Sequence, residues 1–91
     1  MDLQELRSEI EAIDKEFVKL FEKRMNVAKQ VGEYKRENHL PVYDGERESE
    51  LIKKNVQYLE NREYEILTRR FLLQVMELSR ELQEEVKSIK H

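Results

Sequence analysis

Residues 3–37 read LQELRSEIEAIDKEFVKLFEKRMNVAKQVGEYKRE, and apolar side chains recur along them at alternating spacings of three and four. This spacing places the apolar side chains on one side of an α-helix, in a narrow stripe typical of a coiled-coil seam. The stripe consists of Leu3, Leu6, Ile10, Ile13, Phe17, Leu20, Val27, Val31 and Tyr34. We predict one helix of about 35 residues, ending at Glu37 or Asn38 because Pro41 disfavours helical backbone at Leu40.

One position breaks this stripe. Arg24 occupies the place between Leu20 and Val27 where the periodicity calls for an apolar residue. Its guanidinium is permanently charged and costs free energy in a seam unless something pairs with it. Gly32 lies in the same helix, where it costs about 1 kcal/mol relative to Ala, and a close helix crossing would be a sufficient reason for it.

Two shorter helices are expected in the rest of the chain. Asp44 is predicted to be the N-cap of a second helix that ends near Glu60 and Asn61. Its buried stripe is expected to comprise Leu51, Ile52, Val56 and Leu59. A third helix is predicted from about Arg62 to Lys87. Its apolar face would contain Ile66, Leu67, Phe71, Leu72, Val75, Met76, Leu78, Leu82 and Val86.

Two polar residues interrupt the third apolar face. Ser79 and Gln83 continue the row of Leu72 and Met76 at helical spacings. Neutral hydrogen-bonding side chains are therefore expected on a row that faces the core.

The composition describes a single helix-rich domain over residues 1–91, of the all-α class. The chain has no cysteine, which excludes disulfides, a thiolate nucleophile and any Cys-ligated metal. Its net charge is −3 and its basic residues alternate with Glu, so we expect no nucleic-acid partner. Its apolar runs are too short to span a membrane and its acidic start does not resemble a signal peptide, so we expect a cytoplasmic protein without a membrane partner.

The length of the first helix favours a dimer. About 35 residues of helix span about 52 Å, whereas a compact chain of this size has a radius of gyration near 12 Å. The helix must therefore extend beyond its own domain with an apolar stripe uncovered. We predict an intertwined homodimer of six helices, three from each chain.

The first helix also carries a candidate anion site. Lys35 follows Arg24 by eleven residues, which returns it to nearly the same face after three turns. Both side chains only donate hydrogen bonds, so together they favour an anionic ligand. Arg7 lies about 25 Å from Arg24 along the axis, too far to serve one small ligand within one chain. An antiparallel partner helix would bring the partner's Arg7 to Arg24.

Further polar residues complete this inventory. Asp44, Arg47 and Glu48 fall within one turn at the start of the second helix. With Ser79 and Gln83, they add carboxylates, a cation and two neutral groups. The set suits a compact dianion that carries a hydroxyl group.

With these residues at these spacings, the chain resembles the all-helical AroQ class of chorismate mutases over nearly its whole length. The matching segments are Leu6-Arg7-Ser8-Glu9-Ile10, Ile13-Asp14, Glu22-Lys23-Arg24, Val27-Ala28, Val31-Gly32-Glu33-Tyr34-Lys35, Pro41-Val42-Tyr43-Asp44, Glu46-Arg47-Glu48, Ser79 and Gln83. The resemblance implies a homodimer with two active sites, each completed by an arginine of the other subunit. It also implies the Claisen rearrangement of chorismate to prephenate, on the route to phenylalanine and tyrosine, without metal or cofactor.

The resemblance assigns roles by position. Arg24 and the partner's Arg7 would bind the two carboxylates of chorismate, and Ser79 would support these contacts.

The remaining roles concern the ether and hydroxyl oxygens of the substrate. Lys35 and Gln83 would face the ether oxygen of the breaking C–O bond. Glu48 and the region of Asp44 would hold the ring hydroxyl, and Arg47 would line the site. Gly45 follows Asp44 and could loosen its cap, which leaves open whether Asp44 contacts substrate or only caps the helix.

Other interpretations remain open at this stage. Isochorismate-pyruvate lyases share this fold and a similar anion site, although Glu48 and Gln83 together favour the mutase. A coiled-coil scaffold protein would also show the seam. Taken singly, Arg24 could be a snorkelling side chain, and Arg7, Lys35 and Arg47 could be solvated surface charges.

Overall fold

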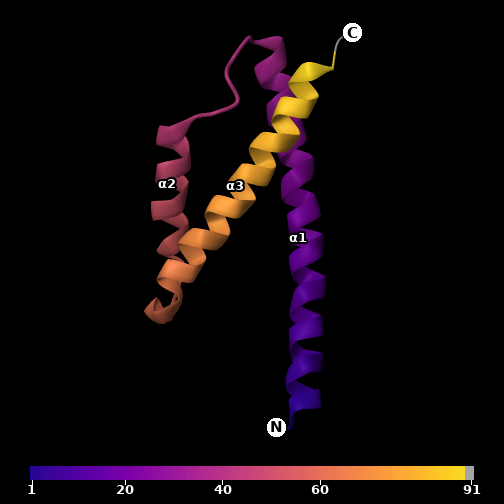
Figure 1. The fold of residues 1–91 in the computed structure, drawn as a ribbon, viewed down its shortest axis with the longest axis vertical. Coiled ribbons are helices and arrows are strands. Elements are labelled where there is room, and N and C mark those ends of the chain that lie inside the picture. Colours follow the sequence, from indigo (N-terminus) through magenta and orange to yellow (C-terminus); the bar gives the residue numbers. More distant parts are fainter. Residues whose placement is uncertain (90–91) are drawn as a thin grey trace.

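The computed structural model describes residues 1–89, which contain three α-helices, one short 3-10 turn and no strand (Figure 1). The elements are α1 (Leu3–Glu37), α2 (Gly45–Val56), η1 (Arg62–Tyr64) and α3 (Glu65–Ser88). The predicted all-α class with a long first helix is confirmed. Within the described residues, every helix is too short or too polar to cross a membrane.

The ends of α1 follow from local hydrogen bonds. At the start, Asp2 Oδ1 accepts a hydrogen bond of 2.8 Å from the Glu5 amide. At the end, the Leu40 amide donates to the Lys35 carbonyl at 2.8 Å, across a His39 residue with φ of 55°. This is the Schellman geometry, in which a left-handed residue satisfies the last carbonyls of a helix. The predicted end of α1 is confirmed, and His39 acts there together with the predicted break at Pro41.

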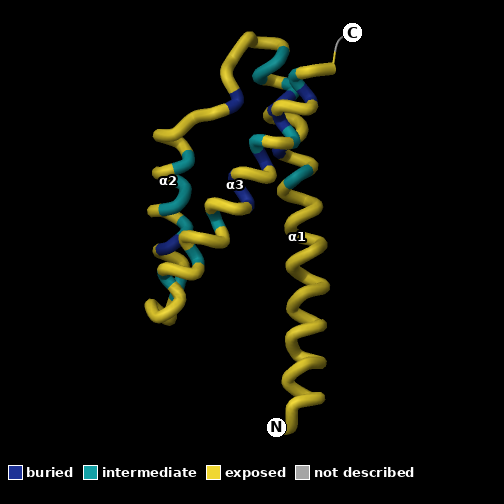
Figure 2. The backbone as a smooth tube through the Cα atoms, viewed as in Figure 1, coloured by how far each residue is buried: buried dark blue, intermediate teal, exposed yellow. Residues whose placement is uncertain are grey.

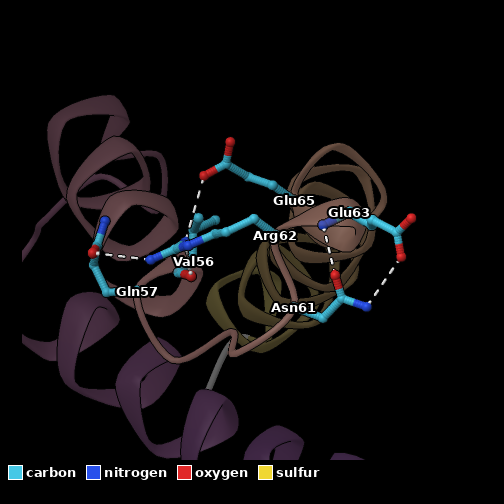
Figure 3. A network of polar contacts seen from close by, with 6 residues as sticks. All are labelled: Val56, Gln57, Asn61, Arg62, Glu63 and Glu65. Carbon is cyan, nitrogen blue, oxygen red and sulfur yellow. Dashed lines mark hydrogen bonds and ion pairs between the residues drawn. The ribbon is translucent and has the colours of Figure 1, made fainter.

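The second helix is shorter than predicted, because it ends at Val56 and not near Glu60 and Asn61. The guanidinium of Arg62 reaches back to this end, as Figure 3 shows. Its Nη1 donates to the Val56 carbonyl at 2.9 Å, and its Nη2 donates to Gln57 Oε1 at 3.4 Å. Since the last carbonyls of a helix have no intrahelical partner, this side chain stabilises an earlier stop.

The start of the third helix also differs from the prediction. Arg62 begins a 3-10 turn, and the α-helix itself starts at Glu65. Asn61 Oδ1 accepts from the Glu63 amide at 3.0 Å and caps this turn. The helix ends at Ser88, one residue beyond its predicted end.

The third helix packs against both other helices, and its backbone comes close to α1 at Gly32. A Cβ atom added to Gly32 would lie 3.1 Å from Gln83 Cα and 3.3 Å from Val86 Cβ. A side chain at this position would therefore push the two helices apart, which is the close crossing that the glycine predicted. Ser79 and Gln83 are buried on this inner face, at 7% and 8% exposure.

Much of the apolar surface lies outside this small core. Every residue of α1 up to Arg24 is exposed, and the start of the helix extends away from the other two (Figure 2). Phe17 still reaches α3, where its ring packs edge-to-face against Phe71 with the ring centres 5.9 Å apart. The third apolar face is only partly buried, because Ile66, Leu67, Phe71 and Leu78 are exposed in the single chain. The radius of gyration is 16.4 Å, against about 12 Å for a compact chain of this length. One chain thus leaves a long apolar surface uncovered.

Candidate active site

A cleft of about 630 Å³ lies between the three helices. Its walls come from the second half of α1, the first turns of α2 and the second half of α3, with Val42 from the connecting loop. Its apolar lining includes Leu20, Val27, Ala28, Val31, Val42, Leu51 and Met76. The cleft is therefore a mainly apolar pocket with a few polar side chains in its walls. Binding sites for small molecules commonly have this composition.

The loop between α1 and α2 is held at this cleft by two lysines. Lys35 Nζ donates to the Val42 carbonyl at 2.8 Å, and Lys87 Nζ donates to the Leu40 carbonyl at 2.6 Å. Val42 itself is buried. The loop consequently places Asp44 and the start of α2 beside the cleft.

Seven of the eight site residues suggested by the sequence line this one cleft. They are Arg24, Lys35, Asp44, Arg47, Glu48, Ser79 and Gln83. Arg7 does not line it, because it lies exposed in the projecting part of α1, about 25 Å from Arg24 along the helix axis.

A buried polar pair forms the α3 side of the cleft. Gln83 Nε2 donates to Ser79 Oγ at 3.2 Å. Within residues 1–89, Gln83 Oε1 is buried without a hydrogen-bond partner. A half turn of the amide would let Ser79 Oγ donate to Oε1 and would turn Nε2 to the unpaired position. In either orientation, one polar end of Gln83 remains for a ligand.

The α2 side of the cleft combines a cap with a carboxylate. Asp44 Oδ1 accepts from the Arg47 amide at 3.1 Å, so the predicted N-cap is confirmed and Gly45 does not prevent it. One turn along, Glu48 Oε2 lies 3.2 Å from Arg80 Nε on α3. The two helices are thus joined by an ion pair at the edge of the cleft.

Two cationic residues of this site were not predicted from the sequence. Arg80 and Lys23 both line the cleft. Arg80 directly follows Ser79 and precedes Gln83 by three residues, a spacing that places it at the flank of the same helix face. Lys23 directly precedes Arg24 on α1. Adjacency to predicted site residues was the signal that could have identified both.

The cleft is electropositive although the chain is acidic overall. Five cationic side chains and two carboxylates line it, whereas the net charge of the chain is −3. The cations are Lys23, Arg24, Lys35, Arg47 and Arg80, and the carboxylates are Asp44 and Glu48. This local reversal of sign favours an anionic ligand.

Two curated proteins share about half of this chain. A segment of 50 residues is 44% identical to the T-protein of Haemophilus influenzae, covering 55% of this chain and 13% of that protein. A segment of 53 residues is 43% identical to the bifunctional chorismate mutase/prephenate dehydratase of Aquifex aeolicus, covering 58% of this chain and 15% of that protein. The matched region is thus a small part of each relative. No solved structure matches the chain significantly.

A family model covers far more of the chain than these segments do. The model of chorismate mutase type II matches residues 6–84, from Leu6 near the start of α1 to Glu84 on α3. This range includes every residue suggested for the site, and it agrees with the resemblance found in the sequence. The chain therefore belongs to the chorismate mutase type II family.

Proposed function

We propose that the chain catalyses the Claisen rearrangement of chorismate to prephenate in the cleft between its three helices. The observation that carries this proposal is the electropositive cleft, lined by seven of the eight residues that the family resemblance indicates. Chorismate bears two carboxylates and a hydroxyl, and the cleft offers cations, neutral donors and a carboxylate in one hollow. The reaction would serve phenylalanine and tyrosine synthesis, with residues 1–91 acting as one domain.

To accelerate this reaction, the protein must orient the substrate and stabilise the charge that develops on it. In this rearrangement one C–C bond forms while one C–O bond breaks within the same molecule, so no protein nucleophile is needed. The protein can hold the reactive conformer and stabilise negative charge as it develops on the ether oxygen. Lys35 and Gln83 are the proposed donors to that oxygen, and the spare polar end of Gln83 supports this role.

The substrate carboxylates require further cations. Arg24 lines the cleft on α1 and would bind one of them as a charge-assisted pair. Ser79 would support this contact, and Arg47 would line the hydroxyl side with Glu48 and Asp44. We assign the second carboxylate to the partner's Arg7.

This assignment requires a homodimer. The exposed stripe of α1 and the exposed part of the α3 face support one, because an apolar surface this long is stable in water only when covered. A second copy in antiparallel orientation would cover the stripe and bring the partner's Arg7 to Arg24. The dimer and the cytoplasmic location stay predictions.

Product identification tests the proposal. Purified protein is incubated with chorismate, loss of its ultraviolet absorbance is followed, and the product is identified by chromatography, with Arg24→Ala as control. Prephenate formed by the wild type, at a rate lost in Arg24→Ala, is the expected result. Pyruvate release from isochorismate without prephenate formation would indicate the lyase instead. A folded dimer inactive on both substrates would favour a scaffold.

A further inference from the structure

One ion pair joins two helices at the edge of the cleft. Glu48 on α2 and Arg80 on α3 meet with Oε2 and Nε 3.2 Å apart, and their side chains are 19% and 35% exposed. Arg80 Nε is shielded from solvent, and its N–H does not point at an acceptor within the described residues. The contact is therefore a close charge pair, whose distance is short but whose hydrogen-bond angle is poor.

Arg80 makes this contact although its own helix offers other carboxylates. Glu77 and Glu84 lie three residues before and four residues after it, the spacings at which ion pairs form along a helix. Both border a shallow outer hollow that Arg80 also lines. In the described structure, the one ion pair of Arg80 is nevertheless with Glu48 on the neighbouring helix.

The ring of Tyr43 is a second neighbour of the Arg80 side chain. The Arg80 guanidinium carbon lies 5.2 Å from the centre of that ring, within cation–π range. The Tyr43 ring packs against the backbone of Gly45. A Cβ atom added to Gly45 would lie only 2.9 Å from Tyr43 Oη, so a larger residue at position 45 would collide with the ring. Gly45 thus leaves room for the ring. Arg80 therefore contacts the ring of Tyr43, which lines the outer hollow, and the carboxylate of Glu48, which lines the cleft.

We propose that Arg80 is a positioning residue that holds Glu48 Oε2, so that Oε1 is left to accept a hydrogen bond from the substrate hydroxyl. This inference rests on the proposed function. An unpaired carboxylate would be free to turn toward the other cations of the cleft, whereas one fixed by Arg80 keeps a single orientation. Arg80 would then lower the cost of ordering Glu48 when substrate binds.

A double-mutant cycle separates this role from a direct contact. Arg80→Met keeps the apolar stem of the side chain and removes its charge, and it is made in the wild type and in Glu48→Gln. In the wild type we expect kcat/KM for chorismate to fall about tenfold. In Glu48→Gln, where the charge pair no longer exists, we expect the same change to cost less than about threefold. Arg80→Lys restores the positive charge but not the planar guanidinium, and should recover part of the loss.

Matched controls address folding. Arg70→Met removes an exposed arginine from the same helix that does not line the cleft, and should leave kcat/KM unchanged. Circular dichroism and thermal unfolding of each variant confirm that it is folded before its kinetics are compared.

The outcomes are distinct. A tenfold loss in the wild type that shrinks in Glu48→Gln supports the proposal. Equal losses in both backgrounds would overturn it, because Arg80 would then act on the substrate or on the fold without Glu48. Unchanged activity in Arg80→Met would overturn it as well. A wild-type protein that leaves chorismate intact would overturn the proposed function itself, and this inference with it.

Discussion

Gly32 on α1 and Gln83 on α3 lie backbone to backbone, so that a Cβ on Gly32 would be 3.1 Å from Gln83 Cα. A close approach of these two helices thus occurs at Gln83, a residue that lines the cleft. The position of the Gln83 amide relative to Lys35 depends on this approach, because the two side chains come from different helices. A glycine in α1 therefore has a direct bearing on the site.

Gly32→Ala should lower activity with only a small effect on stability. The added methyl must move α3 by a few tenths of an ångström, and overpacking of this kind costs about 1–3 kcal/mol, partly offset by about 1 kcal/mol of better helix propensity. We expect kcat/KM for chorismate to fall about tenfold, since displaced donors stabilise the ether oxygen less well. Steady-state kinetics and thermal unfolding measure both effects.

A reversed substitution at an exposed site provides the control. Ala12→Gly on the exposed part of α1 measures the difference in helix propensity between Ala and Gly without a change in packing. A Gly32→Ala protein that is more stable by about 1 kcal/mol and fully active would show that the close approach does not matter.

Arg24→Leu should abolish activity without destabilising the fold. Arg24 is exposed in the single chain and lines the cleft, and leucine fits the apolar stripe on either side of it. Loss of a charged contact to a buried carboxylate costs about 2–5 kcal/mol, so kcat/KM should fall by about 1.5 to 3.5 orders of magnitude. Thermal unfolding should be unchanged or shifted upward. Catalysis close to the wild-type level in this variant would refute the role given to Arg24.

The parts of the structure that sequence could predict are those set by periodicity and local chemistry. The long helix followed from its apolar spacing, the start of α2 from Asp44, and the inner row of α3 from the positions of Ser79 and Gln83. These features depend on neighbours within one or two turns.

Contacts between distant residues were not predictable in the same way. The end of α2 depends on Arg62 reaching back to Val56 after the chain has turned. Arg80 is one of seventeen Lys and Arg residues, and its importance appears only when Glu48 and Tyr43 are seen beside it.

The apolar stripe of α1 should make the protein a dimer that dissociates when the stripe is charged. Ile13 is 55% exposed in the single chain, and Ile13→Asp would place a carboxylate in the proposed interface. We expect a smaller sedimenting species for this variant, whereas the melting temperature of the dimeric wild type should fall on dilution. Ala12→Asp introduces the same residue one position along, on another side of the helix, and should remain a dimer. A monomeric wild type at micromolar concentration would contradict the assembly.

His39→Gly should stabilise the protein. His39 has φ of 55° at the end of α1, a conformation that costs a non-glycine residue about 1 kcal/mol. Glycine removes this strain but loses more entropy on folding, so we expect a net gain of about 0.5 kcal/mol in chemical denaturation. Activity should be unchanged, because His39 does not line the cleft. A less stable His39→Gly protein would mean that the imidazole makes a contact worth more than the strain.

Subunit mixing tests the central claim, a chorismate site completed by a second copy of the chain. Arg7→Ala and Arg24→Ala proteins should each be inactive alone, since each lacks one cation in both sites. After subunit exchange, a mixed dimer has one site with both arginines intact, and an equal mixture should regain about a quarter of wild-type activity. Recovery near that level is the predicted result. An equal mixture that exchanges subunits and stays inactive would contradict the shared site.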